Sequence, residues 1–173
     1  MTPSSLSPLA ESLGRQAVRQ LQVSRTRRNT LLLPLLALVG PAVFAASPTR
    51  AEVWKGPTCG CCHDWIAHLE ANGFKVLSHD EGNDEARRRL GMPIRFGSCH
   101  TALIDGYAIE GHVPAREIKR LLAERPRAVG LAVPAMPIGS PGMDGPAYGG
   151  RRDPYDVLLV ARDGQATVYQ SYR

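Results

Sequence analysis

The segment 56–65, with the sequence GPTCGCCHDW, places three cysteines within four residues, at positions 59, 61 and 62. The neighbours Cys61 and Cys62 are poor disulfide partners, because bridging them closes a strained ring. A bridge between Cys59 and Cys61 is also tight, so Cys59 and Cys62 form the comfortable local pair. This C-x-x-C spacing is typical of the turn between a first strand and a helix, and it limits the folds that suit the chain.

Hydrophobic periodicity and turn signals predict the elements around this turn. The predicted helices and strands are, in order, a strand at 51–55, a helix from 61 or 62 to about 72, a strand at 74–79, a short helix at 83–91, two strands within 100–113 joined at Asp105-Gly106, a helix between Pro114 and Pro126, and a final hairpin of 155–161 with 165–172. This order predicts an α/β fold of the thioredoxin-like type, with a central mixed sheet, flanking helices and a C-terminal hairpin.

The segment 130–154 holds six glycines and five prolines in 25 residues, and we predict that it is a long loop. Loops of this length in compact domains are usually functional or disordered. Met136 and Met143 lie seven residues apart in it. Two interpretations of these methionines stay open: they close over a site, or they only anchor the loop.

The N-terminal part of the chain differs in composition from the rest. A basic cluster at 25–28 precedes an apolar run at 30–46 that ends in small residues. This pattern predicts a secretory signal peptide at 1–45, and the segment 26–32 also fits twin-arginine export. An uncleaved membrane anchor is the alternative, although the run is shorter than the ~20 apolar residues of a comfortable span. We therefore expect one exported, periplasmic domain at 46–173, without stable membrane insertion after cleavage.

The formal charge argues against nucleic-acid binding. Five of the 21 basic residues and one of the 16 acidic residues precede position 46, so the net charge falls from +5 for the whole chain to +1 for the predicted domain. A domain that binds nucleic acid normally carries a strongly basic face. The local run ARRRL at 86–90 is interpreted as a solvated helix face rather than a phosphate site.

Three cysteines around a helix start indicate metal or redox chemistry. Backbone N–H groups and the helix dipole favour thiolates there, and several thiolates repel one another unless protons, a disulfide or a cation relieve them. Cys59, Cys61 and Cys62 are therefore candidate metal ligands. Clustered soft ligands in an exported protein favour Cu(I) over zinc, which is more often held by separate C-x-x-C pairs.

Further candidate ligands lie in the segment GSCHTA at 97–102. In a thioredoxin-like fold the loop before this strand packs beside the start of the first helix, so we expect Cys99 to reach the cysteine turn. His100 is an auxiliary candidate that ranks below Cys99, because consecutive residues of a strand point to opposite faces. The roles of His63 and His112 stay open, and a structural role is favoured for His112.

Four motifs in order resemble the CopG-like copper-resistance family of exported metal-binding proteins: PTCGCCHDW, SCHTALIDGYAIEGHVP, IKRLLAERP and GLAVPAMPIGSPGM. The resemblance covers about 52–143 and is weaker toward the end of the chain. It implies a thioredoxin-like fold, a periplasmic location and copper bound by the C-x-C-C motif. The residues that carry these family positions here are Cys59, Cys61 and Cys62 for the motif and Cys99 for the downstream cysteine.

Three functions remain open from the sequence. The favoured one is a periplasmic copper-binding protein of copper resistance, which holds Cu(I) in the cysteine cluster and either buffers it or hands it on. A copper-dependent oxidoreductase is the enzyme alternative, and a thiol–disulfide oxidoreductase that uses Cys59 and Cys62 is the third. A metal ion and other copper-resistance proteins are the expected partners. The resemblance implies a Gly-Met-Pro sequence in the long loop. This chain has Ala135 where that pattern has glycine.

Overall fold

The computed structural model describes residues 47–173. The predicted signal peptide at 1–45 lies outside the described residues. Among the described residues, no helix combines the length and the apolar character that crossing a membrane needs.

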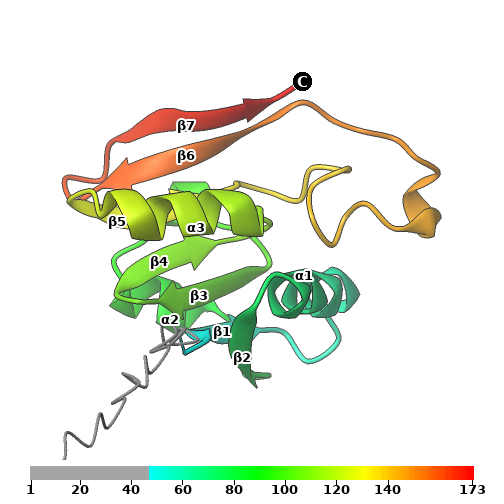
Figure 1. Cartoon of the computed structure of the whole chain (residues 1–173), viewed down its shortest axis with the longest axis horizontal. Helices are drawn as coiled ribbons and strands as arrows, with labels where there is room; N and C mark the ends of the chain where they lie inside the picture. The colour runs from blue at the N-terminus through cyan, green and yellow to red at the C-terminus, as the bar shows by residue number, and fades with distance from the viewer. Residues whose placement is uncertain (1–46) are drawn as a thin grey trace, which may run out of the picture. The chain divides into compact units, whose positions relative to one another are not determined.

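Seven strands of the described residues form one mixed sheet in the order β2-β1-β3-β4-β5-β6-β7 (Figure 1). The strands are β1 (Thr49–Lys55), β2 (Phe74–His79), β3 (His100–Ile104), β4 (Tyr107–Glu110), β5 (Ala128–Ala132), β6 (Tyr155–Ala161) and β7 (Ala166–Tyr172). Two pairs of neighbours, β1 with β2 and β4 with β5, are parallel, and the other pairs are antiparallel. The predicted C-terminal hairpin is β6 with β7, and it extends the same sheet through β5.

Three α-helices flank the sheet in the part of the chain that the structure describes. They are α1 (Gly60–Ala71), α2 (Asp84–Arg89) and α3 (Ala115–Glu124), and the short 3-10 turns are η1 (Ile94–Phe96) and η2 (Pro146–Tyr148). Asn72 caps the C-terminus of α1, and Gly73 follows with a φ of +87°, a left-handed conformation that glycine adopts without strain. Pro114 is the N-cap residue of α3, where its missing N–H removes no helical hydrogen bond.

The core lies on both faces of the sheet. Trp65 of α1 and Ile118 of α3 share one hydrophobic cluster with Ile109 of β4. A smaller cluster contains Met92, which follows α2, and Ala108 of β4. Because neighbouring residues of a strand point to opposite faces, the two clusters lie on opposite sides of the sheet. The predicted α/β class with a mixed sheet and flanking helices is confirmed, and the arrangement is compatible with a thioredoxin-like plan.

The turn between β3 and β4 has the conformation that Asp-Gly favours. Asp105 has a φ of +47° and Gly106 a φ of +87°, as a two-residue type I′ hairpin turn requires. The turn sets the register, so that Thr101 of β3 lies opposite Glu110 of β4. The same register, continued past the ends of the strands, decides which residues meet at the candidate site.

The long loop is shorter than the sequence predicted. Residues 130–132, which we assigned to the loop, belong to β5 and pair with β4. Gly130 permits this close pairing, because a Cβ there would lie 1.7 Å from the carbonyl oxygen of Ala108. A glycine that looks like a loop signal in the sequence is therefore required by strand packing.

Candidate metal centre

The cysteine turn connects β1 to α1. Cys59 is the N-cap residue of α1, and Cys61 and Cys62 follow in its first turn. Cys59 and Cys62 form a disulfide with their Cα atoms 5.3 Å apart, whereas Cys61 keeps a free thiol. The pair that the sequence identified as geometrically comfortable is the pair that is bridged.

Cys99 joins this turn from the segment before β3. Its Sγ lies 3.9 Å from the Sγ of Cys61, which in turn lies 3.7 Å from the Sγ of Cys59. The sulfur atoms of the four cysteines all lie within 4.8 Å of one another. The expectation that Cys99 reaches the cysteine turn is confirmed, although about forty residues of chain separate them.

Two histidines flank the Cys99 sulfur. The Nδ1 of His100 lies 3.3 Å from Cys99 Sγ, and the Nε2 of His112 lies 3.1 Å from it. Cys99 precedes β3 rather than lying within it, so strand alternation does not separate its side chain from that of His100. The expectation that these two side chains diverge is therefore wrong, and His100 lies beside Cys99.

His112 is the site residue that the sequence-based interpretation missed. The hairpin register, continued two residues beyond the pair of Thr101 with Glu110, places Cys99 opposite His112. The intermediate step is also seen, because the N–H of Gly111 donates to the carbonyl of His100 at 3.0 Å. Counting residues outward from the Asp-Gly turn would have found His112, since that turn fixes the register.

A hydrogen bond defines the tautomer of His112. Its Nδ1 lies 2.8 Å from the carbonyl oxygen of Pro141, which can only accept. The Nδ1 therefore carries the hydrogen, and in the neutral ring the lone pair of Nε2 faces the Cys99 sulfur. Metal-binding histidines are commonly oriented in this way, with the second ring nitrogen bonded to a carbonyl.

Burial keeps both imidazoles neutral. It lowers the pKa of His112, although the bond to Pro141 opposes this shift. Burial, with a smaller contribution from the electrostatic interaction with His112, holds the pKa of His100 well below its ordinary value. The Nε2 of His100 is the one buried side-chain nitrogen or oxygen atom of the described residues without a hydrogen-bond partner. Neutral imidazole is the form that ligates metal ions.

The Cys99 thiol holds its proton tightly in the metal-free protein. Burial, reinforced by the neighbouring Cys61, raises its pKa to about 12. The reasoning that the helix start favours thiolate does not extend to Cys99, which lies outside α1. A metal ion bound here must displace this proton, so metal affinity will depend on pH.

The long loop closes against the start of α1. A Cβ at Gly142 would lie 2.6 Å from the carbonyl oxygen of Cys61 and 2.8 Å from the N of Trp65, so only glycine allows this approach. Met143 is buried, and its sulfur accepts a hydrogen bond from Tyr148 at 3.2 Å. Met136 exposes 47% of its surface. The interpretation of Met143 as a loop anchor fits these contacts.

The other three histidines do not belong to the groups of potential metal ligands in the described residues. His63 is exposed. His68 is half-buried and accepts a hydrogen bond from the N–H of Ala115 at 3.1 Å. His79 is half-buried, and its Nε2 lies 2.9 Å from a carboxylate oxygen of Glu52.

The donor set suits a soft or borderline metal ion. With metal–sulfur bonds of about 2.3 Å, two thiolates on one ion lie roughly 4 Å apart, close to the 3.7 and 3.9 Å observed here. While Cys59 and Cys62 are bridged, the available donors are Cys61, Cys99 and the imidazoles. Four thiolates become available only after reduction of the disulfide by two electrons.

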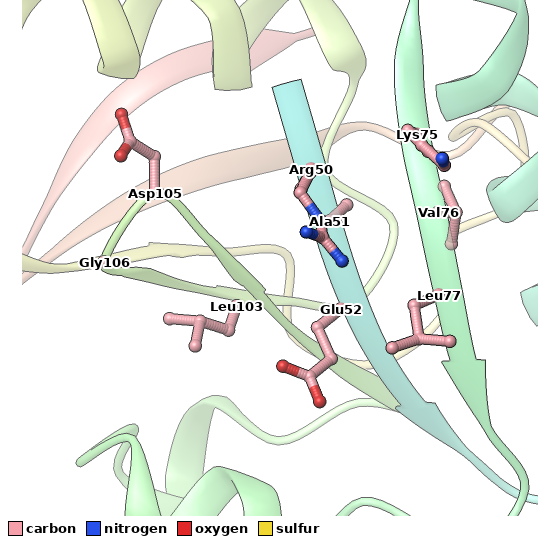
Figure 2. A pocket seen from close by; sticks show the side chains of 9 residues that line it. All are labelled: Arg50, Ala51, Glu52, Lys75, Val76, Leu77, Leu103, Asp105 and Gly106. Atoms are coloured by element: carbon pink, nitrogen blue, oxygen red, sulfur yellow. The ribbon is translucent and has the colours of Figure 1, made fainter. Parts of the chain in front are cut away.

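A separate cavity of about 430 Å³ lies away from this cluster (Figure 2). Figure 2 shows that its lining comes from β1, β2, the end of β3 and the β3–β4 turn, with Arg50, Glu52 and Lys75 among the side chains. None of the four cysteines contributes to it. The cavity combines both signs of charge with exposed Leu77, and its lining contains no cysteine, histidine or methionine.

Comparison with known proteins identifies related structures. The family model described as "Protein of unknown function, DUF411" matches residues 96–143, which include Cys99 and His112. None of the curated proteins matches the chain. A solved structure described as copper resistance protein copG, form 2, is 52% identical with a TM-score of 0.67, and covers 73% of this chain and 99% of its own. Form 1 is also 52% identical, with a TM-score of 0.66 and coverages of 72% and 98%. At this identity and coverage, the chain belongs to the CopG family of copper resistance proteins.

Proposed function

We propose that this protein binds copper as Cu(I) in the periplasm, as part of copper resistance. The observation that carries the proposal is the convergence of four cysteine sulfurs within 4.8 Å of one another. Cu(I) is a soft ion that prefers thiolate ligands. The relatives described as copper resistance proteins support copper as the metal.

Cys59, Cys61, Cys62 and Cys99 are the proposed thiolate ligands, and His100 and His112 are auxiliary candidates. Thiolates that lie 3.7–3.9 Å apart can share one ion, and a sulfur between two ions can bridge them. The predicted signal peptide supports export, because it would direct the domain at 46–173 to the periplasm.

The decisive measurement of selectivity is competition against a chromophoric Cu(I) chelator, repeated with a zinc chelator. We expect the reduced protein to withdraw Cu(I) far more effectively than zinc, since clustered thiolates favour the softer ion. Four thiolates at these distances also suit tetrahedral zinc, so this comparison tests the proposal directly. Equal or stronger zinc binding would refute copper selectivity.

The disulfide supports a second candidate function, thiol–disulfide chemistry at Cys59 and Cys62. Oxidation of these two thiols forms one S–S bond and releases two protons and two electrons. Those electrons suffice to reduce two Cu(II) ions to Cu(I), so this chemistry can operate together with copper binding. A simple exchange enzyme, by contrast, needs only the C-x-x-C pair.

The three motif cysteines separate these functions when each is replaced by serine. For a copper cluster, Cys61→Ser should reduce copper stoichiometry about as much as Cys59→Ser or Cys62→Ser. For a plain disulfide exchanger, Cys61→Ser should be mild, whereas the other two substitutions abolish disulfide reduction. We expect the first pattern in copper analysis, with His63→Gln as an exposed control. A Cys61→Ser protein with full copper loading would contradict the cluster.

A further inference from the structure

Cys99 lies just outside the regular sheet, so the strand ladder does not fix it. β3 begins at His100, and the residue before Cys99, Ser98, is held by side chains instead. The N–H of Ser98 donates to Oε1 of Glu110 at 2.7 Å. The carbonyl of Ser98 accepts from Nη2 of Arg87 at 2.8 Å and from Nδ2 of Asn83 at 3.2 Å.

Two of the groups that hold Ser98, Glu110 and Arg87, form a buried ion pair. The side chain of Glu110 is fully buried, and that of Arg87 is only 6% exposed. The Nε of Arg87 donates to Oε1 of Glu110 at 3.0 Å. The second oxygen, Oε2, accepts from the hydroxyl of Thr101 at 2.6 Å. Each oxygen of the carboxylate is therefore bonded, and one guanidinium spans both Glu110 and the Ser98 carbonyl.

Stability alone gives little reason for this arrangement. Burying an ion pair removes two charges from water, and well-packed apolar residues in its place are often equally stable or more so. The pair does achieve something that apolar residues could not, since it bonds both the N–H and the carbonyl of Ser98. Ligands of a metal site must be held within about 0.5 Å of their working positions.

We propose that Glu110 and Arg87 are positioning residues for Cys99. By fixing the main chain at Ser98, they hold the Cys99 sulfur 3.9 Å from that of Cys61 and 3.1 Å from the Nε2 of His112. The effect on copper rests on the proposed function, whereas the placement of the sulfur does not.

The run ARRRL at 86–90 is therefore only partly a solvated helix face. Arg88 is exposed and pairs with Glu85, as a solvated face predicts. Arg87 instead points inward from α2 and bonds the segment that precedes Cys99. The run combines a solvent-facing side chain with one that reaches the site.

The test compares two buried glutamates. Glu110→Gln removes the charge that faces Arg87, and Glu117→Gln is the matched control. Glu117 is 2% exposed and also pairs with arginine, but its partners are Arg116, Arg120 and the hydroxyl of Tyr172. Both variants lose a buried carboxylate, and only the first touches Ser98. Arg87→Lys is a milder second variant, because it keeps the positive charge but not the fork.

The primary measurement needs no copper. In a Cys59→Ser/Cys62→Ser background, a short bifunctional thiol reagent cross-links Cys61 to Cys99 at a rate that reports their placement. We expect Glu110→Gln and Arg87→Lys to slow cross-linking by roughly 10-fold, with Glu117→Gln unchanged. Separately, in the otherwise wild-type protein, Cu(I) affinity should fall about 10- to 100-fold for the first two variants, the usual loss when an outer-shell partner is removed. Denaturation curves show which variants are folded.

The outcomes are distinguishable. Slower cross-linking in every folded variant of Glu110 and Arg87, with Glu117→Gln unchanged, supports positioning. Wild-type rates in either folded variant, or equal slowing in Glu117→Gln, overturn it. If Glu110→Gln does not fold, Arg87→Lys decides alone. If the wild-type protein takes up no Cu(I), the proposed function fails, and the cross-linking rates still decide whether Glu110 and Arg87 place Cys99.

Discussion

Gly142 offers the sharpest test of how the long loop supports the site. It adopts a φ of +83°, and a Cβ there would lie 2.6 Å from the carbonyl oxygen of Cys61 and 2.8 Å from the N of Trp65. Both contacts are backbone atoms of α1, which cannot move aside as a flexible side chain can. In Gly142→Ala the loop must therefore lift away from the helix.

The expected cost of Gly142→Ala follows from three contributions. A left-handed alanine costs about 1–2 kcal/mol, of which the stiffer unfolded chain returns about 0.5 kcal/mol. Relief of the steric clash costs about 1–3 kcal/mol. Lifting the neighbouring Pro141 carbonyl removes its hydrogen bond from His112, worth about 1 kcal/mol. We expect a total loss of about 4 kcal/mol in the free energy of unfolding.

Gly149→Ala is the matched control for this substitution. Gly149 has a φ of +61°, but no other atom lies within 4 Å of the place that its Cβ would take. It carries the conformational cost of about 1 kcal/mol without the clash. In urea denaturation, the free energies of unfolding of the two variants should therefore differ by about 3 kcal/mol, roughly 150-fold in the unfolding equilibrium. Cu(I) competition should show weaker binding for Gly142→Ala alone. Equal destabilisation by the two substitutions would refute the close packing of the loop on α1.

Three further predictions concern other parts of the chain. Ala135→Gly should stabilise the protein by about 1 kcal/mol in chemical denaturation, because Ala135 has a φ of +59° that glycine adopts without strain. An unchanged or lower denaturation midpoint would contradict this. The high pKa of the Cys99 thiol predicts that Cu(I) affinity rises with pH below about 12, by about tenfold per pH unit for each proton that copper displaces. In chelator competition at several pH values, the affinity of Cys99→Ser should rise less steeply, by the tenfold per pH unit that the Cys99 proton contributes. An unchanged slope would contradict this. N-terminal sequencing of the exported protein should find a chain that begins at or near Ala46, and recovery of intact residues 1–45 on a membrane-bound protein would contradict the signal-peptide prediction.

Local sequence patterns were sufficient for most elements but not for β5. Helix ends at Asn72-Gly73 and the hairpin at Asp105-Gly106 depend on conformations that few residue types adopt, so the sequence displays them directly. β5 contains Gly130 and is followed by a segment with five prolines. This composition locally indicates a loop. Its strand conformation comes from parallel pairing with β4, a contact between distant segments that no local pattern encodes.

The residues of the candidate site also fall into two groups: those that a local motif shows and those that only the fold brings together. The cysteine turn is visible as a motif, because its ligands are adjacent in the chain. Ser98 and its ion pair are not visible, because Arg87 and Glu110 meet only through the packing of α2 against the sheet. His112 lies between these cases. Its position follows from counting along the hairpin, but its bond to Pro141 depends on the fold of the long loop.

The two-residue turn at Asp105-Gly106 also limits which insertions and deletions the chain can tolerate. Both Glu110, opposite Thr101, and His112, opposite Cys99, reach their partners because of the length of this turn. One residue added there would shift the register and turn each side chain of the second strand to the other face. The tip can therefore exchange its amino acids during evolution or engineering, but a change in its length would dismantle the ligand set and its support together.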